Sequence, residues 1–73
     1  MDYWTLKSTA RLLRHRRSRA YFENGRWTEN AEAATNFADL RQVVDACLKY
    51  QLSDVELVMR FESKLPELAI PIK

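Results

Sequence analysis

The Asn-Gly pair at residues 24 and 25 is the feature that most constrains the fold of this 73-residue chain. It contains the only glycine, and Asn-Gly supplies the two positive φ angles that a type I′ turn requires. Residues 21–23 before the pair and residues 26–28 after it are rich in aromatic side chains. The pattern predicts a β-hairpin in which Phe22 lies opposite Trp27.

Two other segments alternate apolar and polar residues with a period of two. The apolar residues of the first are Trp4, Leu6, Ala10 and Leu12. Those of the second are Val55, Leu57, Met59 and Phe61. This alternation is typical of half-buried strands, so we predict one strand through residues 4–12 and a last strand over about residues 55–62.

A helix is predicted to begin after Asp39. Asp39 and Gln42 have the spacing of a capping box, with Asp in place of Ser or Thr. Apolar residues then recur at helical spacing, which predicts that one stripe of the helix packs on the sheet. The stripe consists of Leu40, Val43, Val44, Cys47 and Leu48. Before the helix, Asn30 is expected to cap a single helical turn and Phe37 to enter the core.

The end of the chain has a different composition. Pro66 and Pro71 alternate with aliphatic residues there, which suits an extended segment better than a helix or a central strand. We therefore divide the chain into a single domain over residues 1–63 and an extended, Pro-containing tail over residues 64–73. The aliphatic side chains of the tail are expected to pack on the domain or on a neighbouring copy.

These elements assemble into an α+β domain. We expect a small antiparallel sheet with one helix packed on one face, in the order β-β-β-α-β, followed by the extended tail. The sheet residues expected to face the helix are Trp4, Leu6, Leu12, Phe22, Trp27, Val55, Leu57, Met59 and Phe61.

The charges of the chain are unevenly distributed. Residues 11–19 contain five arginines and no acid, although the net charge of the chain is only +2. Without those five, seven basic residues remain against ten acidic ones, so the rest of the chain has a charge of −3. A concentration of positive charge of this kind indicates an anionic partner.

Nucleic acid is the partner that this pattern favours, bound at the Arg-rich edge of the sheet. The residues expected to contact phosphates are Lys7, Arg11, Arg14, Arg16, Arg17, Arg19 and Arg26. Tyr3 and Tyr21 are expected to stack on bases. An acidic protein surface satisfies the same charge pattern. A competing interpretation is that Glu56 and Glu62 pair with Arg19 or Lys7 and make the face an ordinary surface.

The sequence leaves a second class of function as the alternative. In that class the chain is a protein-interaction or homo-oligomerisation module, and an exposed strand edge or the apolar tail pairs with another chain. A homodimer is one form of this alternative.

The chain offers little for catalysis. It has one cysteine and one histidine, which excludes an internal disulfide and a recognisable zinc site. Cys47 lies on the apolar stripe and is expected to be a core thiol, and His15 is expected to be an exposed turn residue. There is no Gly-rich phosphate loop and no nucleophile–base set, so we predict a non-enzymatic chain without cofactor or metal.

The apolar stretches are also too short to span a bilayer, so no membrane partner is expected. The single cysteine fits a reducing, cytoplasmic setting.

Several short motifs occur in an order that resembles that of other proteins. Gly25-Arg26-Trp27-Thr28 is followed by Phe37, the amphipathic helix and Val55-Glu56-Leu57-Val58. Over about residues 21–61 this order resembles short bacterial or phage proteins of unassigned function. It is also similar to the sheet-plus-helix DNA-binding modules at the start of phage-type integrases, which implies DNA reading by a sheet. Those modules end with the helix, whereas here a strand follows it.

Overall fold

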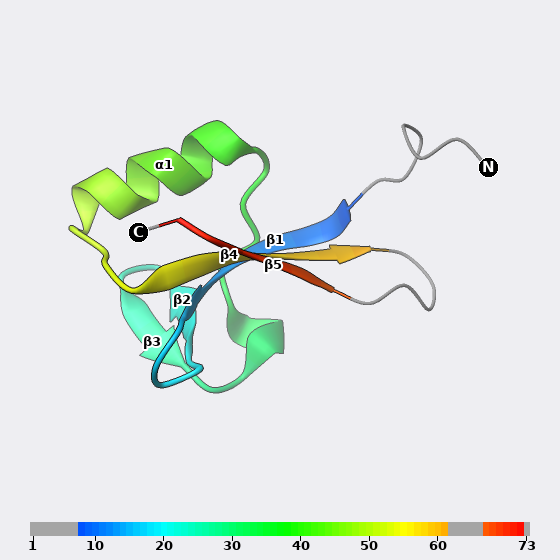
Figure 1. The fold of residues 1–73 in the computed structure, drawn as a ribbon, viewed down its shortest axis with the longest axis horizontal. Helices are drawn as coiled ribbons and strands as arrows, with labels where there is room; N and C mark the ends of the chain where they lie inside the picture. The colour runs from blue at the N-terminus through cyan, green and yellow to red at the C-terminus, as the bar shows by residue number, and fades with distance from the viewer. Residues whose placement is uncertain (1–7, 62–66, 73) are drawn as a thin grey trace.

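The computed structural model of the protein describes residues 8–61 and 67–72. These residues form one antiparallel sheet of five strands with the helix α1 on one face, an α+β fold as predicted (Figure 1). The strand order is β3-β2-β1-β4-β5, so β3 and β5 are the edges. The elements are β1 (Ser8–His15), β2 (Tyr21–Glu23), β3 (Arg26–Thr28), the 3-10 turn η2 (Ala31–Ala33), α1 (Leu40–Lys49), β4 (Val55–Phe61) and β5 (Leu68–Pro71).

The β2–β3 hairpin has the predicted turn and register. Asn24 and Gly25 both have positive φ angles, 45° and 90°, as a type I′ turn requires. Phe22 lies opposite Trp27, and Glu23 lies opposite Arg26. The turn and the register of this element therefore follow from the local sequence.

The hairpin turn packs against the residue that ends α1. A Cβ on Gly25 would lie 3.1 Å from Cε1 of Tyr50, so the ring of Tyr50 would have to move by a few tenths of an ångström to admit a side chain there. The same ring lies 5.1 Å from the ring of Phe22, centroid to centroid. Asn24 also donates its backbone N–H to Thr35 Oγ1 at 2.9 Å. These contacts join the hairpin to the helical layer.

A β-bulge interrupts the pairing of β1 with β4. Ser8 lies opposite Phe61 and Ala10 lies opposite Arg60, so two steps along β1 match one step along β4. An extra residue of this kind moves all later side chains of the strand to the other face of the sheet. The regular alternation predicted for this strand therefore fails at the bulge.

The bulge corrects the predicted faces of β1. Leu13 lies opposite Leu57 and belongs to the core under α1. Leu12 is buried as expected but lies opposite Val58 on the other face. Arg11, predicted for the open face, instead donates its guanidinium N–H to Ala38 O at 2.9 Å, next to the start of α1.

The caps around α1 agree with the sequence. Asp39 Oδ1 accepts the backbone N–H of Gln42 at 3.0 Å, and Gln42 Oε1 accepts that of Ala38 at 3.0 Å. The 3-10 turn η2 is capped by Asn30, whose Oδ1 accepts the N–H of Glu32 at 3.0 Å. These side chains satisfy N–H groups that the first turn of a helix leaves unpaired.

The predicted apolar stripe of α1 is only half correct. Val43 and Cys47 are buried, and Ala46 is buried with them. Val43, Ala46 and Cys47 form the buried face of the helix, with Val43 at its centre. The other residues of the predicted stripe lie to one side of this face. Leu40, Val44 and Leu48 are accordingly 57%, 51% and 65% exposed.

The core lies between α1 and the sheet. Phe22, Val55, Leu57 and Phe37 are buried there as predicted, with Met59 packed against them. Its remaining members are Leu13, Val43, Ala46, Cys47 and Leu52.

Other residues that were predicted to face the helix are not part of the core. Trp27 lies on the edge strand β3 and is 43% exposed, with the rings of Phe22 and His15 in T-shaped arrangement at 6.0 and 5.4 Å between centroids. Phe61 is half-buried and is not part of the core cluster. The predicted core positions Trp4 and Leu6 lie outside the described residues.

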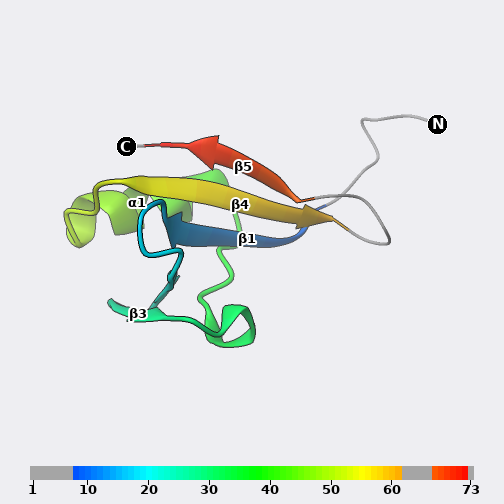
Figure 2. The ribbon, with the colours of Figure 1, turned by 60° about the horizontal axis from the view of Figure 1, so that its bottom comes forward.

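The tail forms an edge strand. β5 pairs antiparallel with β4, and Leu57 lies opposite Ile70 (Figure 2). The N–H of Ile72 extends the pairing by donating to Val55 O at 3.1 Å. The tail therefore packs on the domain and adds a fifth strand to the sheet, which the predicted order did not include.

Replacing Gly25 with alanine is expected to destabilise the protein by about 1–2 kcal/mol, because an L side chain is strained at this positive φ. The contact with Tyr50 adds to the cost. Chemical denaturation measures the loss. The matched control is Asn24→Gly at the neighbouring turn position, which glycine tolerates and which we expect to be almost neutral. Equal stability of the two variants would contradict the prediction.

Candidate functional site

The arginine run spans the end of β1, the following turn and the approach to β2. The turn is built around His15, whose Nδ1 accepts the backbone N–H groups of Arg17 at 3.2 Å and Ser18 at 3.3 Å. The backbone N–H of His15 also closes the turn by donating to the backbone oxygen of Ala20 at 2.8 Å. His15 is half-buried at the end of β1 and thus less exposed than predicted.

Arg14 lies inside the protein. Its register partners on the neighbouring strands are Glu56 and Tyr21. Its Nε donates to Glu56 Oε2 at 2.7 Å, and its Nη1 approaches Tyr21 Oη at 3.4 Å and Glu67 Oε1 at 3.3 Å. Only 8% of the Arg14 side chain and 10% of the Glu56 side chain are exposed. We conclude that Arg14 acts within the fold.

Two opposing effects act on the pKa of Arg14. Burial lowers it, whereas the hydrogen bonds to Tyr21 and Glu56 and the charge of Glu56 raise it. The net shift is upward, so the guanidinium stays charged. A permanent buried cation requires its carboxylate partner.

The arginines of the turn also have acidic neighbours. Arg16 and Arg17 lie 3.5 and 3.4 Å from the carboxylate of Asp54, and Arg19 lies 3.3 Å from Glu56. The pairing of Arg19 with Glu56 was one of the two alternatives drawn from the sequence, and the structure contains it. Glu62, the other acid in that alternative, lies outside the described residues.

The pairing is incomplete. In the ion pairs among residues 8–61 and 67–72, the guanidinium groups of Arg14, Arg16, Arg17, Arg19 and Arg60 share the carboxylates of Asp54, Glu56 and Glu67. The side chain of Arg17 is 82% exposed and that of Arg19 is 61% exposed. Positive charge therefore remains at the turn.

The remaining predicted site residues are dispersed. Tyr21 is half-buried, with the guanidinium carbons of Arg14 and Arg60 at 5.8 and 5.9 Å from its ring centre. Its ring is thus already in contact with two cations. Arg26 is exposed on the edge strand β3. Tyr3 and Lys7 lie outside the described residues.

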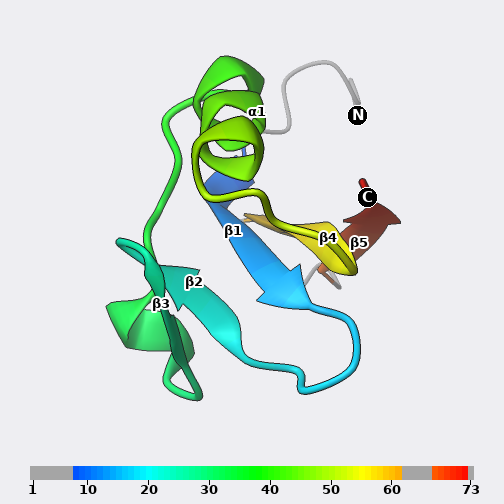
Figure 3. The same ribbon diagram turned by 90° about the vertical axis from the view of Figure 1, so that its left-hand side faces the viewer.

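A different surface, which the sequence did not predict, lies beside α1. Seen from the C-terminal end of α1 with the sheet below, a right-handed helix turns counter-clockwise toward the viewer (Figure 3). Val43 is part of the core below, and the next residue is rotated by about 100° around the helix, so helix geometry directs Val44 to the side on which Figure 3 shows β5. Leu40 and Leu48, four residues before and after Val44, share that side.

The strand β5 presents aliphatic side chains to the same side. Leu68 and Ile70 pair with Met59 and Leu57, which face α1, so both share the helix-side face of the sheet. Leu68, Ile70 and Ile72 are 49%, 41% and 37% exposed. We call the combined set the α1–β5 surface. It consists of Leu40, Val44, Leu48, Leu68, Ile70 and Ile72.

The outer edge of β5 is poorly suited to pairing with another strand. Ile72 donates its N–H toward β4, so by alternation the groups of Ile70 also point inward and those of Ala69 and Pro71 point outward. Pro71 has no N–H to donate at that edge. A proline in this position blocks strand addition.

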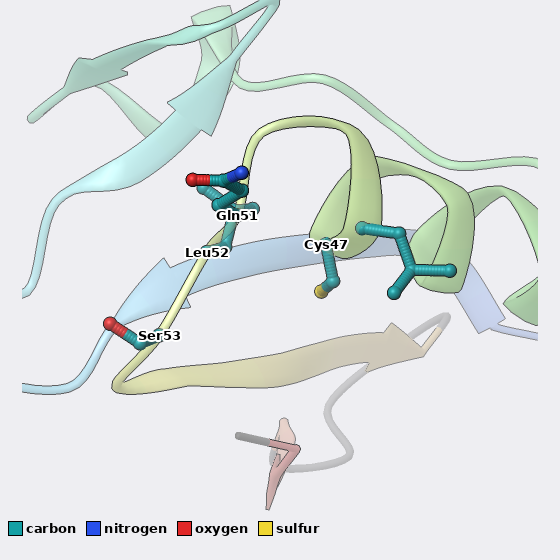
Figure 4. Close-up of a pocket in the computed structure, with 5 residues that line it drawn as sticks. Cys47, Gln51, Leu52 and Ser53 are labelled. Atoms are coloured by element: carbon teal, nitrogen blue, oxygen red, sulfur yellow. The ribbon is translucent and has the colours of Figure 1, made fainter.

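One pocket lies at the C-terminal end of α1, with a volume of about 400 Å³ (Figure 4). It is lined by Cys47, Leu48, Gln51, Leu52 and Ser53. Cys47 is a buried core thiol as predicted, and no acid, base or aromatic side chain lines the pocket. Leu48 belongs to both the pocket and the α1–β5 surface.

Within residues 8–61 and 67–72, no three His, Cys, Asp or Glu side chains are arranged to hold a metal ion. In the same part of the chain no helix has the length and hydrophobicity needed to cross a membrane. Comparison with protein-family models, with curated proteins and with solved structures gave no match.

Replacing Glu56 with glutamine is expected to destabilise the fold by about 3 kcal/mol, because it leaves the buried charge of Arg14 without a counter-charge. Urea denaturation measures this value. The matched control is Asp54→Asn, since Asp54 pairs only with exposed arginines and asparagine tolerates its φ of 55°. That variant is expected to lose less than about 1 kcal/mol. A similar loss in both variants would show that Glu56 has no special role.

Proposed function

We propose that this chain is a protein-interaction module that binds another protein chain through the α1–β5 surface. The observation that supports this most strongly is the exposure of its six aliphatic side chains, between 37% and 65%. Together they expose apolar area on the order of 500 Å² on one side of the molecule, which is comparable with the largest apolar patch of a typical monomer. Patches of this size commonly mark interaction sites.

The alternatives have less support. Arg14 is buried against Glu56, and Tyr21 is in contact with two guanidinium groups, so two groups expected at a nucleic-acid interface are engaged within the fold. Strand addition at β5 is opposed by Pro71. Side-chain contact with an apolar surface of another protein remains the interaction that suits this part of the molecule best.

Site-specific photo-crosslinking in cells tests the proposal. Benzoylphenylalanine placed at Val44 or at Ile70 of the full chain is expected to form the same protein adduct, because both positions lie on the α1–β5 surface. The matched control places it at Glu29, which is exposed on the loop after β3. Adducts at neither surface position, or equal adducts at Glu29, would overturn the proposal.

A second candidate function is binding of nucleic acid or another polyanion by the turn after β1. The exposure of Arg17 and the surplus of guanidinium groups over carboxylates at this turn favour it. Contacts from Arg16, Arg17 and Arg19 to three phosphates predict a log-log salt slope of roughly −3 for duplex DNA.

Oligonucleotide titration between low and moderate salt measures this slope. Arg17→Ser is expected to reduce its magnitude by about 1, because one phosphate contact is lost. The matched control, Arg41→Ser on α1, is expected to leave it unchanged. A slope near zero, or the same slope in both variants, would remove this candidate.

A further inference from the structure

We propose that the partner of the α1–β5 surface is a second copy of this chain, packed through antiparallel α1 helices about a two-fold axis beside Val44. This inference rests on the proposed function and names its partner. Three features of the surface support it: the spacing of its helix residues, the charges next to them and the blocked edge of β5.

The spacing on α1 suits helix-to-helix packing. Leu40, Val44 and Leu48 are four residues apart and form one ridge along the helix. Ridges of this spacing interdigitate with the same ridge of a second helix, in the commonest class of helix packing. A two-fold axis beside Val44 brings Leu40 against the partner subunit's Leu48. The ridge is therefore complementary to itself, as an isologous interface requires.

The charges beside the ridge, Arg41 and Asp45, are centred on residue 43, one residue from the centre of the ridge. Arg41 and Asp45 follow Leu40 and Val44 by one residue, so they lie along the solvent side of the ridge. Neither has an ion-pair partner within the described residues. Antiparallel packing about Val44 brings Arg41 near the partner subunit's Asp45, and Asp45 near the partner subunit's Arg41, so that two attractive contacts outweigh the single approach of the two Asp45 side chains beside the axis. Parallel helices would instead bring like charges together, which selects the antiparallel arrangement.

The strand β5 completes the apolar area without pairing. Leu68, Ile70 and Ile72 lie on the helix-side face of β5, and the missing N–H of Pro71 prevents the two sheets from joining edge to edge. Side-chain packing is then the means by which two copies cover this surface. About 500 Å² of aliphatic area with a polar rim approaches the roughly 800 Å² that each partner of a standard interface buries.

Sedimentation of the full chain tests the dimer. The wild type is expected to reach twice its mass of 8.6 kDa as its concentration rises. Arg41→Asp and Asp45→Arg are each expected to weaken dimerisation at least tenfold, because each places like charges across the two-fold axis. The double variant, which exchanges the two charges, is expected to restore it.

Mixing the two single variants gives a second readout. One variant then carries two acids beside its ridge and the other carries two arginines, so the mixture is expected to form a heterodimer. The matched control for net charge is Arg26→Asp on β3, which is expected to dimerise as the wild type does. Far-UV circular dichroism verifies that each variant is folded.

The outcomes separate this inference from the proposed function. A wild-type chain that stays at 8.6 kDa up to about 1 mM, or charge variants that dimerise normally, overturns the dimer. If Val44 and Ile70 then crosslink to a different protein, the proposed function stands without it. If neither position yields an adduct and the chain is monomeric, both fail.

Discussion

The pairing of β1 with β4 is the constraint on which the other features depend, because it contains the bulge between Ser8 and Ala10. Side chains alternate strictly along a strand, so one extra residue reverses every later position. Beyond the bulge, Leu13 enters the core and Arg14 moves to the opposite face. The two faces of the central sheet thereby acquire different chemistry: the face under α1 is apolar, and on the other face Arg14 and Glu56 lie beside the buried Leu12 and Val58.

The face opposite α1 is organised by the buried pair of Arg14 and Glu56. Removing two charges from water is costly, and the 2.7 Å contact offsets that cost only while both members are present. Glu56 also forms an ion pair with Arg19 of the turn, and Glu67 forms ion pairs with both Arg14 and Arg60. The middle of the arginine run therefore contributes to the fold, and only its turn keeps exposed positive charge.

The apolar face is larger than the helix that covers it. α1 has ten residues and buries Val43, Ala46 and Cys47, so its flank and the neighbouring strand β5 remain in contact with solvent. A small domain has few elements with which to cover a five-stranded sheet. The α1–β5 surface is exposed because no further element covers it. Binding of another chain there would remove this apolar surface from water, which is favourable.

The sequence by itself determined the local elements: the Asn-Gly turn, the caps at Asn30 and Asp39 and the α+β class. Each depends on hydrogen bonds or alternation within a few residues, and so each can be read from neighbouring positions. Only the tertiary structure decided the bulge, the rotation of α1 and the acids that meet the arginines. Arg14 and Glu56 are 42 residues apart, and Arg14 and Glu67 are 53 apart. Such contacts follow from the register of distant strands and from packing, which no local pattern encodes.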